Sequence, residues 1–228
     1  MIDIHSHVIP FVDDGSQSLQ SSLDMLRKVE SQGVKTLFCT PHFRYGFFDC
    51  DKNEVSKNFN LLKEQAQNQR INVNLLLGQE IHYNKNIVNE LKNGQYLTLN
   101  NSKYVLIEFP YEKKEDMPEV VYNLVRAGYE PVVAHYERYY YADVDTAYEL
   151  RALGGHIQIT ASSIFGEGGL AIKKLATELL KNNLVDFVAG DYHEDRSYRM
   201  DKASKHIRKK YGEEVYENLF VKNAEKFV

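Results

Sequence analysis

The chain begins MIDIHSHVIPFVDDG (residues 1–15), a stretch in which isoleucines alternate with polar residues before two aspartates and a glycine. An alternation of period two is typical of a β-strand. His5 and His7 are two residues apart, so a strand would point both imidazoles to the same side. Asp14 follows in the loop after this strand, where we expect Asp13 to serve as an orienting or turn residue. The stretch predicts a first strand that ends in metal-ligating side chains.

The rest of the chain repeats a strand-then-helix pattern. Six further strand-like stretches occupy residues 34–40, 71–81, 103–110, 130–136, 156–162 and 185–193. Helical patterns occupy residues 18–32, 53–70, 117–128, 145–153, 171–182 and 199–211. Seven βα-like units without a break in composition predict a single α/β domain over residues 1–228. Parallel strands with helical crossovers favour an irregular TIM-like β/α barrel of about seven strands.

Composition narrows the class of protein. The 228 residues contain 28 basic and 32 acidic side chains, a net charge of −4, which argues against a nucleic-acid binder that relies on a basic face. No apolar run approaches the roughly 20 residues that span a bilayer, and the first residues do not resemble a signal peptide. Cys39 and Cys50 form no CxxC pair, which favours reduced thiols. We therefore expect a cytoplasmic protein without membrane insertion.

Polar side chains recur where the predicted strands end. The carboxyl ends of parallel strands in a barrel meet at one face, where active sites are assembled. Nine side chains that can ligate metal come from six different units and are expected to converge there. They are His5, His7, Asp14, His42, Glu80, Glu108, His135, Asp191 and His193.

Each of these residues taken singly has an ordinary structural explanation, such as a hydrogen-bonded core histidine or a solvated carboxylate. Nine of them at strand ends are much harder to explain in that way. Without cations, the grouped carboxylates would repel one another and the imidazoles would be unpaired. The pattern therefore predicts a metal centre. His82 could support it from outside, whereas His156 and His206 are expected to be structural or surface residues.

The donor set narrows the metal and the chemistry. Imidazole and carboxylate without thiolate suit Mn²⁺, Fe²⁺ or Zn²⁺, and nine ligands imply two or three ions, with Glu80 as a natural bridge. Clustered divalent ions at a barrel mouth favour hydrolysis of phosphate esters by a metal-activated hydroxide. Arginine binds two phosphoryl oxygens at once, and Arg138 follows His135 closely. Arg196 and Arg199 are further candidates for the phosphate contact.

The motifs IHSHVIPFVDDG, TPH, GQE, IEFP, AHYER and GDYH, which cover residues 1 to about 200, resemble the PHP (polymerase and histidinol phosphatase) superfamily. Within it they are most similar to the CpsB/YwqE-type bacterial tyrosine phosphatases of capsule and exopolysaccharide loci. The resemblance implies that His135, Asp191 and Arg138 are catalytic, with Arg138 on the phosphate. It also implies Mn²⁺ as the preferred ion and the tyrosine-rich tail of a bacterial tyrosine kinase as the substrate, and it leaves homo-oligomerisation open.

The same resemblance divides the ligands into three sets. It implies a first ion on His5, His7, Glu80 and Asp191, a second on Glu80, Glu108 and His135, and a third on Asp14, His42 and His193. Glu80 bridges the first two sets only.

Four positions depart from the family pattern. HSH replaces HCH, AHYER replaces AHPER, Gly190 stands where a serine is usual, and Tyr198 stands where an arginine is usual. All the metal positions are met, so we expect hydrolysis to survive these changes. A histidinol-phosphatase-type enzyme for small molecules remains an alternative, disfavoured by Glu108 where that branch would present histidine. A non-catalytic module that binds metal or phosphotyrosine is a second alternative, disfavoured because no ligand is lost.

Two aromatic stretches adjoin the predicted site. FRYGFFDC follows His42 and YERYYYAD follows His135, both in strand-end loops. Aromatic walls there could stack a phosphotyrosine ring, or the tyrosines could line a partner surface or the core of a loop.

Overall fold

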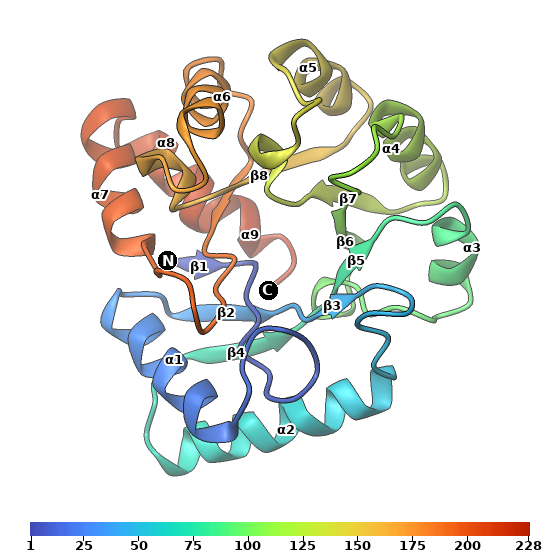
Figure 1. Ribbon diagram of the computed structural model, residues 1–228. Coiled ribbons are helices and arrows are strands. Elements are labelled where there is room, and N and C mark those ends of the chain that lie inside the picture. Colours follow the sequence, from blue (N-terminus) through green and yellow to red (C-terminus); the bar gives the residue numbers. More distant parts are fainter.

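The computed structural model describes residues 1–228 as short parallel strands surrounded by helices (Figure 1). The strands are β1 (Ile2–Asp3), β2 (Thr36–Cys39), β3 (His42–Phe43), β4 (Asn74–Leu77), β5 (Glu80–His82), β6 (Tyr104–Glu108), β7 (Glu130–Val133), β8 (His156–Thr160) and β9 (Phe187–Ala189). The helices are α1 (Leu19–Ser31), α2 (Lys52–Asn68), α3 (Ile87–Lys92), α4 (Met117–Arg126), α5 (Val144–Ala152), α6 (Leu170–Lys181), α7 (Met200–Tyr211), α8 (Glu213–Glu217) and α9 (Asn223–Glu225). The expected α/β barrel is confirmed.

Two additional short strands explain why nine strands replace the predicted seven. The stretch 34–40 forms β2 and stops before Pro41, whose ring nitrogen has no hydrogen to donate to a ladder, and β3 follows that proline. The stretch 71–81 divides into β4 and β5 around Gly78, where a Cβ atom would lie 2.7 Å from Leu99. The sheet therefore has two parts, ordered β1-β2-β4 and β3-β5-β6-β7-β8-β9, with every pairing parallel.

The first and last strand segments meet and close the ring. Ser6 forms a parallel bridge with Tyr192, the amide of His7 donates to the carbonyl of Tyr192 at 2.9 Å, and the amide of Asp191 donates to the carbonyl of His5 at 2.9 Å. These bonds bring residues from the two ends of the chain side by side. Candidate ligands from the first and the last strand segment therefore lie next to each other.

Helix α1 shows how local sequence sets the outer layer. It begins after Ser18, whose side chain accepts a hydrogen bond from the amide of Ser21. Its buried residues include Leu23, Leu26 and Val29, at the helical spacing that the sequence predicted. Gly33 follows the helix with φ +80°, a left-handed conformation that glycine adopts without strain. Helix α3 was not predicted, because six residues are too few to reveal a helical period.

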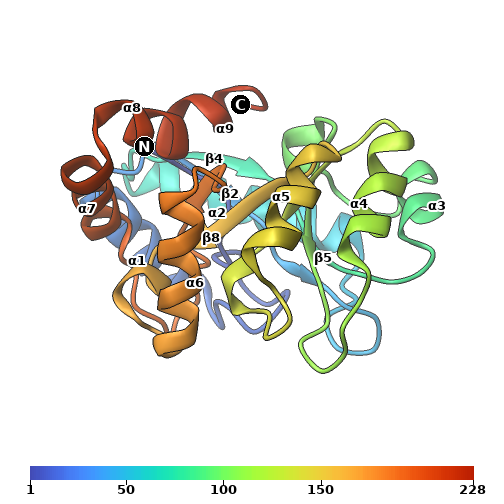
Figure 2. The same cartoon turned by 90° about the horizontal axis from the view of Figure 1, so that it is seen from above.

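Two apolar cores hold the barrel together. A larger one packs the strands against the outer helices, and a smaller one fills the interior with side chains such as Phe38, Leu106 and Val132. Phe227 joins the interior core from the C-terminal segment. In Figure 2, α8 and α9 lie at one end of the molecule and the long loops that follow the strands lie at the other. One end is thus covered by the C-terminal helices, which leaves the strand-end loops to form the mouth. No helix combines the length and apolar character needed to cross a bilayer.

Candidate metal centre

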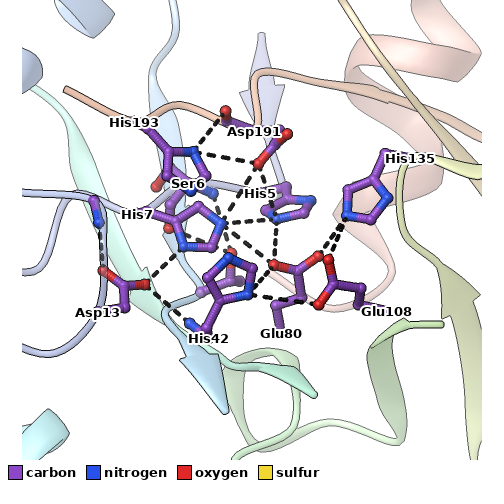
Figure 3. Close-up of polar contacts among 12 residues, drawn as sticks. His5, Ser6, His7, Asp13, His42, Glu80, Glu108, His135, Asp191 and His193 are labelled. Carbon is purple, nitrogen blue, oxygen red and sulfur yellow. Dashed lines mark hydrogen bonds and ion pairs between the residues drawn. The ribbon is translucent and has the colours of Figure 1, made fainter. Parts of the chain in front are cut away.

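The structure brings all nine candidate ligands together at the mouth, where each lies next to at least one other. Figure 3 labels all of them except Asp14. Glu80 is central among them. Its carboxylate is fully buried and faces the rings of His5, His7, His42 and His135. The side chains form three overlapping groups.

The first group lies between the two ends of the chain. The Nε2 atoms of His5 and His7 are 3.1 Å apart. Oε2 of Glu80 is 3.2 Å from the first nitrogen and 3.4 Å from the second. Oδ1 of Asp191 is 3.6 and 3.5 Å from the same two atoms. Four donor atoms therefore surround one point.

The second group lies on the other side of Glu80. Nε2 of His135 is 2.8 Å from Oε1 of Glu80 and 3.7 Å from Oε1 of Glu108. Nδ1 of His42 is 2.8 Å from Oε2 of Glu80, so this histidine also borders the group. His82 lies outside it, with Nδ1 3.0 Å from Oε2 of Glu108, where it can orient that carboxylate.

The third group is the most exposed. Oδ1 of Asp14 lies 3.7 Å from Nε2 of His42 and 3.5 Å from Nε2 of His193. The ring of His7 stacks on that of His193, with centroids 4.0 Å apart, and joins this group to the first. The neighbouring His193 ring lowers the pKa of Asp14 to about 2, so this carboxylate is ionised at neutral pH.

Asp13 orients the first histidine pair, as the sequence suggested. Its Oδ2 atom lies 2.7 Å from Nδ1 of His7 and accepts from the amide of His42, and its Oδ1 atom accepts from the amide of Gly15. Burial alone would raise the pKa of Asp13, but the effect of His7 is in the opposite direction. The net result is a lowered pKa, so the carboxylate is ionised. Nδ1 of His7 must then donate, and Nε2 presents its lone pair to the centre.

The donor set fits divalent cations. The Nε2 atoms of His5 and His7 face each other, and Nε2 of His193 and Oε2 of Glu80 are buried without a hydrogen-bond partner. Burial would raise the pKa of Glu80, but the surrounding histidines hold it well below its usual range. Buried, ionised carboxylates among imidazole lone pairs are the environment that Mn²⁺, Fe²⁺ or Zn²⁺ would stabilise.

Two candidate ligands have a strained backbone. His135 directly follows Ala134 at the end of β7 with φ 33°, and Asp191 follows β9 with φ 46°. Left-handed conformations are costly for residues with a Cβ atom, and such strain concentrates at functional sites. At both positions the chain turns sharply as it leaves the barrel, which directs the side chain across the mouth.

Two of the three predicted arginines reach the centre. Arg138 and Arg196 both donate from Nη1 to Oδ2 of Asp191, at 2.6 and 3.0 Å. Burial would raise the pKa of Asp191, but Arg138 keeps it well below its usual range. Arg199 does not reach the centre. It pairs with Glu167 and lines a separate groove of about 880 Å³ that contains none of the nine ligands.

A cavity of about 190 Å³ opens over the centre. Its lining is formed by Asp14, His42, Arg44, Phe48, Glu108, Tyr111, His135, Arg138, Asp191 and Arg196. Phe48 stacks on His42 with centroids 5.4 Å apart, and Tyr111 stacks on His135 with centroids 5.8 Å apart. The cavity therefore has cationic side chains and two aromatic faces near the candidate ligands.

The two departures at positions 190 and 198 compensate each other. A Cβ atom on Gly190 would lie 2.5 Å from the Tyr198 ring and 2.6 Å from the Asp3 carboxylate. Tyr198 instead occupies this space and donates from its hydroxyl to Oδ2 of Asp3 at 2.8 Å. Asp3 also accepts from the amides of His5 and Gly190, so one buried carboxylate ties the first strand segment to the last.

Sequence reasoning missed three residues of this region. Arg44 and Tyr111 line the cavity, and Gln158 on β8 contacts two candidate ligands. Two of them carried a signal in the sequence: Arg44 is a cation two residues after His42, and Gln158 is a polar residue between two isoleucines. His156 lies away from the centre and pairs with Glu130, as expected for a structural histidine.

Comparison with known proteins gives relatives from one family. The family described as "Capsular polysaccharide synthesis, CpsB/CapC" matches residues 1–228. Tyrosine-protein phosphatase CpsB of Streptococcus agalactiae is 35% identical over 235 residues, which cover 99% of this chain and 97% of that protein. Tyrosine-protein phosphatase YwqE of Bacillus subtilis is 34% identical over 230 residues, which cover 99% of this chain and 90% of that protein.

Solved structures agree. One matching crystal structure belongs to a pair of proteins, YwqE of Bacillus subtilis and CpsB of Streptococcus pneumoniae, that are described as unique metal-dependent tyrosine phosphatases. It matches with a TM-score of 0.87 and 32% identity, and the match covers 95% of this chain and 90% of that chain. Histidinol phosphate phosphatase of Lactococcus lactis matches with a TM-score of 0.59 at 11% identity, covering 92% of this chain and 94% of that chain. The second match concerns the fold alone.

Proposed function

This chain belongs to the CpsB/CapC family, and from that premise we propose that it is a metal-dependent protein-tyrosine phosphatase. One observation carries the proposal. Three groups of imidazole and carboxylate donors overlap in pairs, at His7, Glu80 and His42, beneath a cavity that presents Arg138 and Arg196. Such a site suits a phosphate ester, whose oxygens are negative and whose hydrolysis needs an activated water.

The nine ligands are proposed to hold two or three ions, with Mn²⁺ preferred and Fe²⁺ or Zn²⁺ as alternatives. His5, His7, Glu80 and Asp191 would hold the first, Glu80, Glu108 and His135 the second, and Asp14, His42 and His193 the third. Bound divalent ions would bring the pKa of a water near neutrality and offset phosphoryl charge. The mixed nitrogen and oxygen donors without thiolate support this choice of metals.

The side chains around the ions have their own roles. Arg138 would bind two phosphoryl oxygens, because a guanidinium matches a phosphate in a bidentate way. Its contact with Asp191 holds the guanidinium over the centre before substrate arrives. His135 and Asp191 act as ligands that fix the reacting region. Arg196 would add a second positive charge, and Arg44 lines the same cavity.

The substrate is proposed to be a phosphotyrosine in a protein, specifically the tail of a bacterial tyrosine kinase that controls capsule or exopolysaccharide synthesis. The aromatic faces of Phe48 and Tyr111 support an aromatic leaving group, since aromatic rings pack in stacked or edge-to-face pairs. A histidinol-phosphatase-type activity on small molecules and a non-catalytic binding module are the outcomes that would replace this proposal.

We further propose that residues 1–228 form one PHP-type phosphatase domain that acts in the cytoplasm. A single closed ring of strands supports one domain. The thiols of Cys39 and Cys50 are free, which suits a reducing compartment.

The proposal is tested by a substrate panel. Chelator-treated protein is assayed for phosphate release from a phosphotyrosine peptide, the same peptide with phosphoserine, and histidinol phosphate, each with and without added Mn²⁺. We expect Mn²⁺-dependent release that is fastest from phosphotyrosine. Faster release from histidinol phosphate would favour the small-molecule enzyme, and no release from any substrate would favour the binding module.

A further inference from the structure

Gln158 lies on β8, within a predicted strand stretch (156–162) that contributes no candidate ligand, yet it contacts residues of two ligand groups. Its side chain is fully buried. The Oε1 atom is 3.0 Å from Nδ1 of His5, and it accepts a hydrogen bond from the backbone amide of His135 at 3.0 Å. A single oxygen thus connects the first group with the second.

The backbone contact fixes the orientation of the Gln158 amide. A backbone N–H can only donate, so the Gln158 atom that faces His135 must be the carbonyl oxygen. Because the same oxygen faces Nδ1 of His5, that nitrogen must carry a hydrogen. The Nε2 atom of His5 then directs its lone pair at Glu80 and Asp191, as a ligand requires.

The contact also supports a strained backbone. His135 has φ 33° and ψ 48°, a left-handed conformation that residues with a Cβ atom avoid. The hydrogen bond from its amide to Gln158 holds this turn in place. The turn directs Nε2 of His135 to 2.8 Å from Oε1 of Glu80 (Figure 3).

We propose that Gln158 is a positioning residue that sets the metal affinity of the centre, by holding His5 in its ligating tautomer and His135 in its ligating backbone conformation. The inference rests on the proposed metal centre and deepens it. Asp13 likewise holds His7 in its ligating tautomer, but with a carboxylate as the acceptor. Gln158 provides an acceptor without adding negative charge to a site that already contains Glu80, Glu108 and Asp191. Partners of metal-bound histidines typically contribute 10- to 100-fold in metal affinity.

The test compares three variants by Mn²⁺ binding to chelator-treated protein, measured from the EPR signal of free Mn²⁺ and by calorimetry. Gln158→Met keeps the length of the side chain and removes the acceptor. Gln158→Glu keeps the acceptor. Thr160→Val is the matched control, because Thr160 lies two residues along the same strand, is buried, and has a hydroxyl without a hydrogen-bond partner.

We expect Gln158→Met to weaken Mn²⁺ binding by about 10- to 100-fold. Gln158→Glu and Thr160→Val should bind Mn²⁺ with an affinity no more than about threefold weaker than that of the wild type, because each keeps the acceptor at position 158. Equal Mn²⁺ affinity of Gln158→Met and wild type would overturn the inference. So would a loss in Gln158→Glu as large as that in Gln158→Met.

Circular dichroism of each metal-free variant separates folding from positioning. If Gln158→Met does not fold, Gln158→Glu decides: retained Mn²⁺ binding supports the inference, and a loss of about tenfold or more in a folded protein overturns it. A wild-type protein that binds no Mn²⁺ would contradict the metal centre itself, an outcome that is distinct from failure of the Gln158 role.

Discussion

Arg138 donates from Nη1 to Oδ2 of Asp191 at 2.6 Å, while Oδ1 of the same carboxylate faces the Nε2 atoms of His5 and His7. One carboxylate therefore joins a cation that lines the cavity to the histidines of the first ligand group. This contact explains the strongly lowered pKa of Asp191 and holds the guanidinium over the candidate ions. Arg138 is in place to receive a phosphoryl group without a large movement.

Replacing Arg138 with alanine should reduce kcat/KM for a phosphotyrosine peptide by about 10²- to 10³-fold, the usual loss when one preorganised charge-stabilising donor is removed. Saturating Mn²⁺ in the assay keeps the centre loaded. Arg199→Ala is the matched control, because that guanidinium pairs with Glu167 away from the cavity. Equal kcat/KM for Arg138→Ala and Arg199→Ala would show that Arg138 does not bind the phosphate.

Asp3 should make the metal-free protein less stable as pH rises. Burial raises the pKa of this carboxyl from its ordinary 3.8 to about 6. A pKa that is higher in the folded state means that the stabilisation is complete below pH 3.8 and is lost as pH rises through 6. Asp3→Asn removes the charge and keeps an oxygen for the amides of His5 and Gly190.

The Asp3→Asn variant should therefore gain stability relative to wild type as pH rises from about 4 to about 6, up to a difference of order 1–3 kcal/mol that then stays level at higher pH. Urea unfolding of both proteins in chelator, at several pH values, measures the difference. A difference that does not change between about pH 4 and pH 6 would contradict the buried-carboxyl explanation.

Gly190 and Tyr198 should behave as a coupled pair. Gly190→Ser places a side chain where the Tyr198 ring and the Asp3 carboxylate already lie, so we expect a loss of about 1–3 kcal/mol in the free energy of unfolding. Tyr198→Arg vacates the ring position and leaves a cation for Asp3. The double variant should be more stable than the sum of the single changes by about 1 kcal/mol or more, measured by urea unfolding. Additive effects would show that the two positions do not compete for the same space.

The sequence identified the barrel and the nine converging residues because both rest on local patterns. Strand ends could be located from alternation, and the carboxyl ends of parallel strands share one face. The short strand β3 after Pro41 and the break at Gly78 were not predicted, and the break at Gly78 depends on close packing against Leu99. The meeting of the first and last segments at Ser6 and Tyr192 is a long-range pairing that local patterns do not report.

The supporting residues of the centre were harder to predict. Gln158 appears in the sequence as one polar residue in an apolar strand, and only the fold places it against both His5 and His135. Arg196 and Arg199 are three residues apart and chemically alike. The turn after β9 directs one at Asp191 and the other at Glu167, a distinction that depends on backbone direction.

The central claim is that the shared centre hydrolyses phosphotyrosine, and comparison of two histidines tests it most directly. His135 lies in the centre, whereas His156 pairs with Glu130 away from it. The measurement is kcat/KM on a phosphotyrosine peptide with Mn²⁺ for wild type, His135→Ala and His156→Ala. We predict a loss of roughly three orders of magnitude for His135→Ala and a value near wild type for folded His156→Ala. A folded His135→Ala enzyme with wild-type activity would contradict the account.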